Sequence, residues 1–257
     1  MQNIPLLDPR RDVVFKTIFS QDNEESLTAR NSLLSALLDR NVKDSIVMNN
    51  DLPVSDIRDK AARLDLHCII DDGHQVNIEM QMCNSVRNLE DRLIYYLCQL
   101  YSSQSCKGEP YKIFKEVYVV LISNETVLTT EKEFISKILL RYSDGRVYST
   151  KLNITVLELS KISEEVTLDS AVFRWGLYLK TASDNNHKEL VGQLINQDRG
   201  ILMANTLLSK ITQSDYERAR VMERERILMD YYSDLDYAVT TGLEQGKLEQ
   251  KREIAAA

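Results

Sequence analysis

Two carboxylic acids and an amide lie on adjacent strand-like segments, at a spacing that could support chemistry on a phosphoryl group. Asp65 lies within the apolar segment 63–70, and Glu79 and Gln81 lie within the alternating segment 75–82. Because successive side chains of a strand point to opposite faces, Glu79 and Gln81 are expected on the same face. The chemistry of this pair depends on how close Asp65 comes to it.

An Asp-Asp-Gly turn signal at 71–73 joins the two segments and predicts a β-hairpin. Residues 65 and 79 are symmetric about position 72, so their Cβ atoms are expected about 4.5–5.5 Å apart. Two carboxylates this close repel each other unless a proton or a cation lies between them. Oxygen ligands of this kind suit Mg²⁺ or Mn²⁺, which can activate a water molecule for attack on a phosphoryl group. The alternative interpretation is a solvated polar face on an amphipathic hairpin, and the pattern alone favours that alternative.

Periodicity predicts the elements that position this hairpin. The expected helices cover 8–20, 24–40 and 86–104, and the expected further strands cover 117–122 and 153–159. The segment 117–122 is apolar on both faces, as is typical of a strand covered by helices on each side. A Thr-x-x-Glu capping box at 130–133 predicts another helix, ending near residue 140.

The pattern changes along the chain and predicts two parts. We expect a mixed α/β core over residues 1–162 and an all-α C-terminal region over 163–257. From Asp169 onward the spacing is helical, and charged helices are expected over 215–232 and 235–254.

Composition excludes several classes of protein. The 257 residues include only 8 Gly and 4 Pro, which argues against an all-β sandwich and against a collagen-like repeat. The net charge of −7 argues against nucleic-acid binding through bulk basicity, although it leaves room for a local phosphate site. No apolar run approaches the ~18–20 residues of a membrane span, and no secretory signal is expected. The four cysteines include no C-x-x-C pair, which indicates free thiols and a cytoplasmic protein.

Seven short motifs occur in order along nearly the whole chain. They are D-x-x-F-K-x-x-F at 12–19, L-D at 64–65, N-I-E-M-Q at 77–81, R-x-x-Y-Y at 92–96, G-x-x-Y at 108–111, E-L-x-K at 158–161 and a glycine-spaced segment at 242–249. In this order they resemble the recombination-promoting nuclease family, also described as PD-(D/E)XK nuclease family transposases. The resemblance implies a restriction-endonuclease-like core, which is a mixed sheet flanked by helices, and a metal-dependent DNA endonuclease.

The resemblance also implies roles for individual residues. Asp65 and Glu79 would be the ligands of Mg²⁺ or Mn²⁺, with the main-chain carbonyl of Met80 as a third ligand. Gln81 stands where most of the superfamily has a lysine that orients the attacking water. Glutamine can hydrogen-bond a water or a phosphate oxygen, but it brings no positive charge. The proline in the name of the superfamily motif is also absent, because Leu64 precedes Asp65.

Two residues are candidates for the missing positive charge. Lys16 lies four residues after Asp12 on one predicted helix face, and Arg92 lies on the helix after the second strand of the hairpin. The alternative for Lys16 is a surface ion pair with Asp12, and the alternative for Arg92 is a surface position.

The leading hypothesis is therefore a DNA endonuclease, linked to recombination or to mobile elements. The rival hypothesis is a non-catalytic binding or regulatory protein on a nuclease-like scaffold, which the acidic net charge and the missing lysine favour. DNA is the expected partner and a membrane is not. Gly242 and Gly246, four residues apart, indicate a contact in a homo-oligomer as one interpretation of the last helix.

Overall fold

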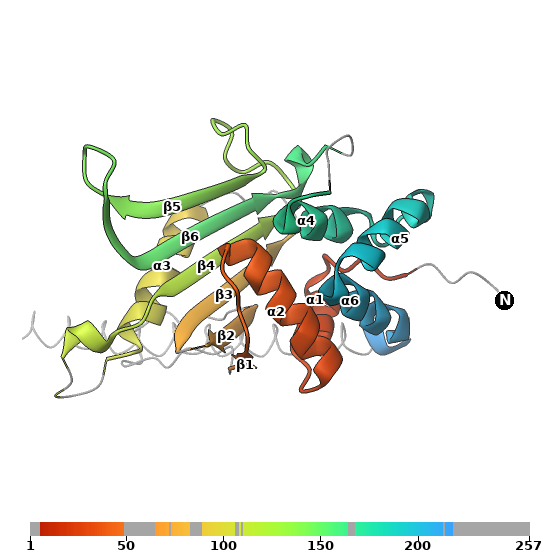
Figure 1. Cartoon of the computed structure of the whole chain (residues 1–257), viewed down its shortest axis with the longest axis horizontal. Helices are drawn as coiled ribbons and strands as arrows, with labels where there is room; N and C mark the ends of the chain where they lie inside the picture. The colour runs from red at the N-terminus through yellow and green to blue at the C-terminus, as the bar shows by residue number, and fades with distance from the viewer. Residues whose placement is uncertain are drawn as a thin grey trace, which may run out of the picture. The chain divides into compact units, whose positions relative to one another are not determined.

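The computed structural model describes residues 6–48, 65–71, 73–82, 89–105, 108, 110–163, 168–212 and 214–217. A mixed six-stranded sheet with helices on both faces makes up the fold (Figure 1). This architecture confirms the predicted α/β class with a restriction-endonuclease-like core.

The sheet has the strand order β1-β2-β3-β4-β6-β5. Its strands are β1 (Ser45–Val47), β2 (Leu66–Ile70), β3 (His74–Gln81), β4 (Val117–Ser123), β5 (Ile135–Arg141) and β6 (Val147–Glu158). The pairs β1–β2, β2–β3 and β5–β6 are antiparallel, whereas β3, β4 and β6 run parallel. The three parallel strands end level with one another, because Gln81 pairs with Ser123 and Ser123 pairs with Glu158.

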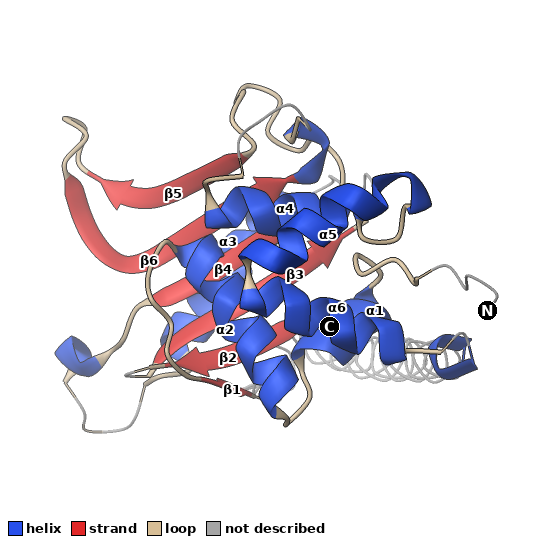
Figure 2. Cartoon of the chain, turned by 45° about the vertical axis from the view of Figure 1, so that its right-hand side comes forward, coloured by secondary structure: helices blue, strands red, loops and turns tan. Residues whose placement is uncertain are grey.

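The helices form two layers around this sheet (Figure 2). They are α1 (Asp12–Phe19), α2 (Glu24–Leu38), α3 (Leu89–Ser102), α4 (Ala171–Thr181), α5 (Lys188–Gln197) and α6 (Arg199–Lys210), with short 3₁₀ turns η1 (Tyr111–Ile113), η2 (Leu159–Lys161) and η3 (Asn185–His187). Helix α3 lies behind the sheet in Figure 1, and α2 and α4 lie in front of it. The strand β4 is therefore covered on both sides, as its unbroken apolar sequence predicted.

Helix α3 packs on the sheet through one apolar stripe. Leu89, Leu93, Leu97 and Leu100 recur at helical spacing and are all buried. They meet the inward side chains of the two central parallel strands, which are Val117, Val119, Leu121, Ile154 and Val156. This layer holds α3 beside the end of β3, where the predicted site residues lie.

A buried arginine connects the elements of the opposite layer. Arg30 of α2 is only 4% exposed. Its guanidinium donates hydrogen bonds to the carbonyl of Phe19 at the end of α1 (2.7 Å) and to both the carbonyl and the hydroxyl of Ser45 in β1 (2.9 and 2.8 Å). These bonds tie α1, α2 and the first strand together.

The helix predicted after the capping box at 130–133 is wrong, because residues 135–141 form strand β5. The strand β6 has 12 residues, and without β5 its outer edge would present unpaired backbone groups. A helix of the same short length would be marginal on its own. Pairing with β6, the next strand along the chain, therefore outweighs the local helix signal. The short strand β1 was not predicted either.

Contacts divide the chain into a unit over Met1–Ile211 and a unit over Thr212–Ala257. The helices α4, α5 and α6 fall within the first unit, together with the sheet. The sequence-based boundary at residue 162 stays a prediction. Of the helix expected over 215–232, only residues 215–217 are described, and the helix expected over 235–254, with Gly242 and Gly246, lies outside the described residues.

The predictions of free thiols and of no membrane span can be compared with the structure only over the described residues. In the described ranges, no helix is long and apolar enough to cross a membrane. Cys68 and Cys98 are free thiols, as expected, while Cys83 and Cys106 lie outside the described residues.

The contact between α2 and α6 gives a test of packing. A Cβ atom added at Gly200 would lie 2.2 Å from the Cβ atom of Ser32. We expect Gly200→Ala to lower the free energy of unfolding by about 1–3 kcal/mol, because the helices must move apart. The control is Gly192→Ala on α5, where an added Cβ meets nothing within 4 Å. It should stabilise by up to about 1 kcal/mol, since alanine is the better helix former. Urea denaturation measures both, and equal effects of the two substitutions would contradict the packing argument.

Candidate active site

The register of the β2–β3 hairpin decides where Asp65 lies. Leu66 pairs with Ile78, so Asp65, one residue before β2, comes opposite Glu79. The tight turn depends on Gly73, which has a φ of 96° and donates its N–H to the carbonyl of Ile70 (3.0 Å). The symmetry of the two acids about the turn, inferred from the sequence, matches this register.

Hydrogen bonds join the two carboxyl groups through the backbone. The N–H of Asp65 donates to Oε1 of Glu79 (3.3 Å), and the N–H of Met80 donates to Oδ2 of Asp65 (3.0 Å). Nδ2 of Asn77, two residues before Glu79 on the same face, also donates to Oε1 of Glu79 (2.8 Å). The structure therefore brings Asp65 and Glu79 together on one face of the sheet, with their orientations set by neighbouring donors.

Burial makes this pair electrostatically unfavourable. Glu79 is only 6% exposed. Loss of hydration raises its pKa to about 7, and the nearby charge of Asp65 contributes in the same direction. Burial also raises the pKa of Asp65, although the charge of Lys16 opposes that effect. A positive ion between the two carboxyl groups would remove much of this penalty.

Lys16 reaches the pair from α1. Its Nζ lies 3.3 Å from Oδ1 of Asp65 and 2.8 Å from Oδ1 of Asp12. Burial by itself lowers the pKa of Lys16, but the charges of Asp65 and Asp12 outweigh it and the net shift is upward. Lys16 thus forms the i,i+4 ion pair and also contacts Asp65, and its role in the site stays a prediction.

Gln81 and Arg92 contact each other at the end of β3. One terminal nitrogen of Arg92 donates to Oε1 of Gln81 (3.2 Å). The charge of Arg92 also acts to lower the pKa of Glu79, so its guanidinium belongs to the same electrostatic environment. Met80 lies between Glu79 and Gln81, and its buried side chain points to the opposite face of the strand. Only its main-chain carbonyl could therefore serve as a ligand.

Two further residues belong to this environment and were not assigned to it from the sequence. Asn77 was placed on the correct face by the alternation, but its bond to Glu79 was not foreseen. Of the adjacent Tyr95 and Tyr96 of α3, the sequence indicates only that at least one packs in the core. Burial raises the pKa of Tyr96 to about 12, and the charge of Glu79 adds to this shift. The R-x-x-Y-Y spacing, which puts Tyr96 one turn after Arg92, was the signal for that position.

The donor set fits a divalent cation that keeps several water ligands. Within the described part of the chain, no three His, Cys, Asp or Glu side chains form a group that could hold a metal ion. The candidate ligands are the carboxylates of Asp65 and Glu79 and the carbonyl of Met80. Mg²⁺ typically takes one or two protein carboxylates and retains water, so this small set of oxygen ligands is compatible with it.

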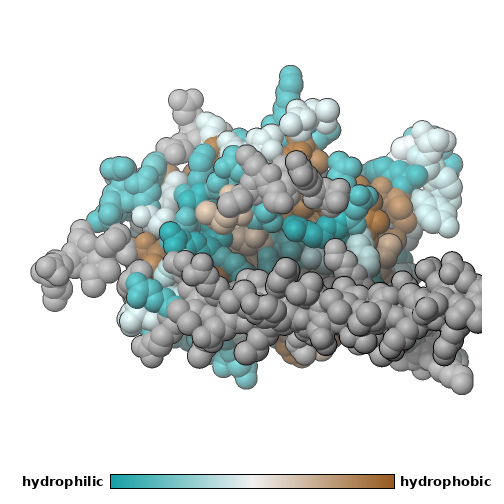
Figure 3. Space-filling model, turned by 180° about the vertical axis from the view of Figure 1, so that it is seen from behind, coloured by the Kyte–Doolittle hydropathy of each residue, from teal (hydrophilic) through white to brown (hydrophobic). Residues whose placement is uncertain are grey.

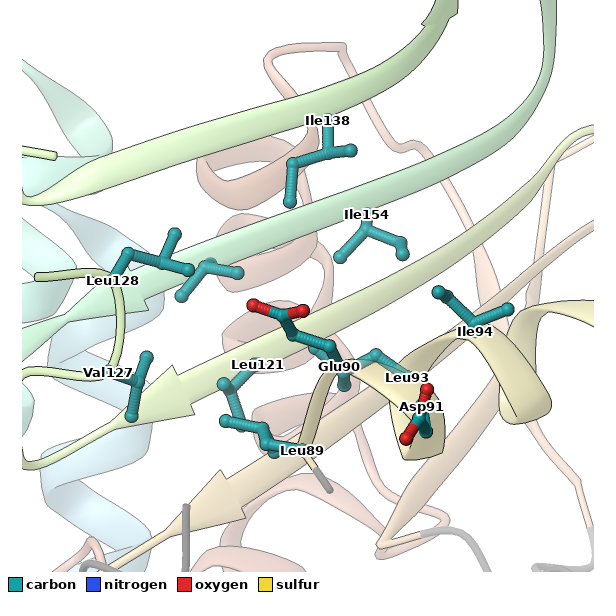
Figure 4. Close-up of a pocket in the computed structure, with 11 residues that line it drawn as sticks. Leu89, Glu90, Asp91, Leu93, Ile94, Leu121, Val127, Leu128, Ile138 and Ile154 are labelled. Carbon is teal, nitrogen blue, oxygen red and sulfur yellow. The ribbon is translucent and has the colours of Figure 1, made fainter. Parts of the chain in front are cut away.

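An apolar cavity of about 500 Å³ is lined in part by Leu121, the neighbour of Glu79 across β3 and β4. It lies between the start of α3 and the strands β4, β5 and β6, and apolar side chains dominate its wall (Figure 4). None of the predicted site residues lines it. The polar groups at the end of β3, and not this cavity, are the candidate active site.

With the geometry described, the comparisons with known proteins identify the family. The family model described as PD-(D/E)XK nuclease family transposase matches residues 9–238. The chain belongs to this family. Searches of curated proteins and of solved structures found no match. Membership in the PD-(D/E)XK nuclease family transposases indicates a function related to nucleases or transposases, and PD-(D/E)XK nucleases generally use divalent metals and act on DNA.

The raised pKa of Glu79 predicts how stability depends on pH. The folded protein holds the Glu79 proton up to about pH 7, whereas the unfolded chain releases it near 4.5. Stability is therefore lost as the pH rises through this window. In EDTA at about pH 8, Glu79→Gln should unfold at a higher temperature than the wild type, and the advantage should vanish near pH 5.

Thermal unfolding at the two pH values measures this effect. Glu189→Gln on the exposed face of α5 is the matched control and should show no pH-dependent difference from the wild type. A Glu79→Gln protein that is equally destabilised at both pH values would contradict the prediction.

Proposed function

We propose that this protein is a Mg²⁺- or Mn²⁺-dependent DNA endonuclease that hydrolyses phosphodiester bonds and acts in recombination or in mobile elements. The observation that carries this proposal is the convergence of Asp65 and Glu79 beside the ammonium group of Lys16. Family membership supports the class of reaction.

Asp65, Glu79 and the carbonyl of Met80 would hold the metal ion. When bound, such an ion lowers the pKa of a water molecule and offsets negative charge on the phosphoryl group. Asn77 and the N–H of Asp65 orient the carboxylate of Glu79 through two hydrogen bonds to Oε1. The N–H of Met80 does the same for Asp65.

The remaining polar groups take over the tasks of the absent motif lysine. Gln81 orients a water or a phosphate oxygen by hydrogen bonding, and the bond from Arg92 fixes its amide. Lys16 supplies positive charge beside Asp65. Arg92 supplies a second positive charge for a phosphate oxygen, in the planar geometry that suits such contacts. The positive charge thus comes from Lys16 and Arg92, whereas Gln81 orients the water.

Plasmid nicking in Mg²⁺ or Mn²⁺ tests the site. Asp65→Asn and Glu79→Gln should each reduce the cleavage rate by more than about 100-fold, since changes outside the ligand set already cost 10–100-fold. Glu189→Gln, purified in parallel, should cleave like the wild type. Equal cleavage by all the proteins would indicate a contaminating nuclease and would refute the assignment of the site.

The same assay separates the two cationic residues. Lys16→Met and Arg92→Met should each lower the cleavage rate on the order of 10- to 1,000-fold, because each removes charge that stabilises the transition state. Lys188→Met, an exposed lysine on α5, is the matched control for loss of one charge. Full activity of Lys16→Met would assign the role to Arg92 alone.

A non-catalytic binding protein on the same scaffold is the second candidate. The specific observation in its favour is that Lys16 already contacts Asp65, and that no three-residue metal group occurs among the described residues. Calorimetry with Mn²⁺ distinguishes the two functions. The endonuclease should bind Mn²⁺ more tightly at about pH 8 than at pH 6, because its carboxyl ligands must lose their protons. Wild-type protein that takes up no Mn²⁺ at millimolar concentration would favour the binding protein.

A further inference from the structure

The β5–β6 hairpin extends beyond the rest of the sheet. Val117, the first residue of β4, pairs with Leu152, so β6 residues 147–151 continue past the end of β4 with β5 beside them. We call residues 140–151 the ribbon. Its residues 141–148 are all exposed, and it projects at the left of Figure 1. A two-stranded arm of this kind contributes little to the hydrophobic core. Its length and its side chains are therefore not explained by packing within the fold.

The ribbon is basic in an acidic protein. It contains Arg141, Arg146 and Lys151 against a single acid, Asp144, and so carries a net charge of +2 in a chain of net charge −7. Lys137 lies just before it and pairs with Asp39 (3.2 Å). From behind, the projecting end is coloured white to teal, which marks a surface of intermediate to hydrophilic residues (Figure 3).

Contacts within the ribbon hold its tip in shape. The rings of Tyr142 and Tyr148 meet edge to face at 5.4 Å, and the guanidinium of Arg146 lies 5.1 Å from the centre of the Tyr142 ring. Arg141 donates to the carbonyl of Gly145 (2.7 Å), and Arg146 pairs with Asp144 (2.8 Å). These contacts use a minority of the five N–H donors that each guanidinium carries. The tip therefore presents ordered arginines to the solvent.

The strand registers limit how far the ribbon can lie from the candidate active site along the sheet. Glu79 is level with Leu121, and Leu121 is level with Val156. Nine residues of β6 separate Val156 from Val147, which is at most about 30 Å along the strand, because the register shifts within this stretch and β6 bends there (Figure 1). This length is close to one turn of B-form DNA, about 34 Å.

We propose that the ribbon contacts double-stranded DNA about one helical turn away from the bond at the Asp65–Glu79 site. The proposal deepens the proposed endonuclease function and rests on it. A two-stranded β-ribbon has the width that the major groove admits, and exposed arginines bind phosphate oxygens. The ribbon thus gives an acidic protein a localised grip on a long duplex.

A second copy of the chain is the other conceivable occupant, and the ribbon is poorly suited to it. The register shifts at Leu139, Leu140 and Arg141, and the edge strand β5 carries the charged residues Lys137 and Arg141. Bulges and charges are the means by which edge strands avoid pairing with another chain. Two ribbons of the same positive charge would also repel each other.

The test is DNA binding measured by fluorescence anisotropy in EDTA, which prevents cleavage. The variant is Arg141→Glu with Arg146→Glu, and the matched control is Lys188→Glu with Arg199→Glu on the exposed faces of α5 and α6. On a duplex of about 24 base pairs, the ribbon variant should bind at least about tenfold more weakly than the control and show a salt slope smaller by about 2. A duplex of about 8 base pairs, or about 27 Å, cannot reach the site and the ribbon together, so the wild type should bind it at least about tenfold more weakly than the long duplex.

Two other results would overturn the proposal. The first is equal binding of the long duplex by the ribbon variant and the control. A ribbon variant that changes the sedimentation coefficient of the protein but not its DNA affinity would assign the ribbon to self-association. The milder Arg141→Gln with Arg146→Gln, checked by thermal unfolding, must show the same direction of change, which separates lost contacts from misfolding.

Failure here is distinguishable from failure of the proposed function. Asp65→Asn should bind the long duplex at least as tightly as the wild type, because it removes a negative charge beside the phosphate, while it loses nicking. Ribbon-dependent binding without any metal-dependent nicking would refute the endonuclease and leave the ribbon contact standing. Nicking with ribbon-independent binding would refute the ribbon contact alone.

Discussion

The register of a single β-hairpin is the constraint on which the candidate site depends. Because side chains alternate along a strand, a slip of one residue would move Asp65 to the face opposite Glu79. The turn at Gly73 and the buried side chains of β2 and β3 oppose such a slip from both ends of the hairpin. The parallel pairing with β4 then places the pair at the end of the sheet, beside α1 and α3. Local turn chemistry and long-range packing therefore specify the same geometry.

The electrostatics of the site oppose the stability of the fold. Burial raises the pKa of both carboxyl groups, and the fold retains them close together at the cost of stability at neutral pH. Lys16 offsets part of this cost. Buried carboxyl groups close to each other are expected where a protein binds or transforms a ligand. A bound cation or substrate then offsets the electrostatic cost of burying them.

The sequence was sufficient for the parts of the structure that depend on local signals. Alternation and the Asp-Asp-Gly turn predicted the hairpin, the meeting of Asp65 with Glu79 and the common face of Glu79 and Gln81. Helical spacing located α1, α2 and α3 to within a few residues. The strand β5 was missed because the capping signal before it indicates a helix, whereas pairing with β6 determines its conformation. The contact of Lys16 with Asp65 depends on how α1 packs on the sheet, which no local pattern encodes.

The buried Arg30 has a consequence for how the site is assembled. Its guanidinium is satisfied by acceptors in α1 and β1 that are brought together only when both elements have docked. A guanidinium left buried with unmet donors is costly, so partial docking of this layer is unfavourable. Placement of α1, and with it the ammonium group beside the two acids, therefore becomes an all-or-none event. A sheet that lost α1 and α2 would keep the two acids and Arg92 of α3, but it would lose the ammonium group of Lys16.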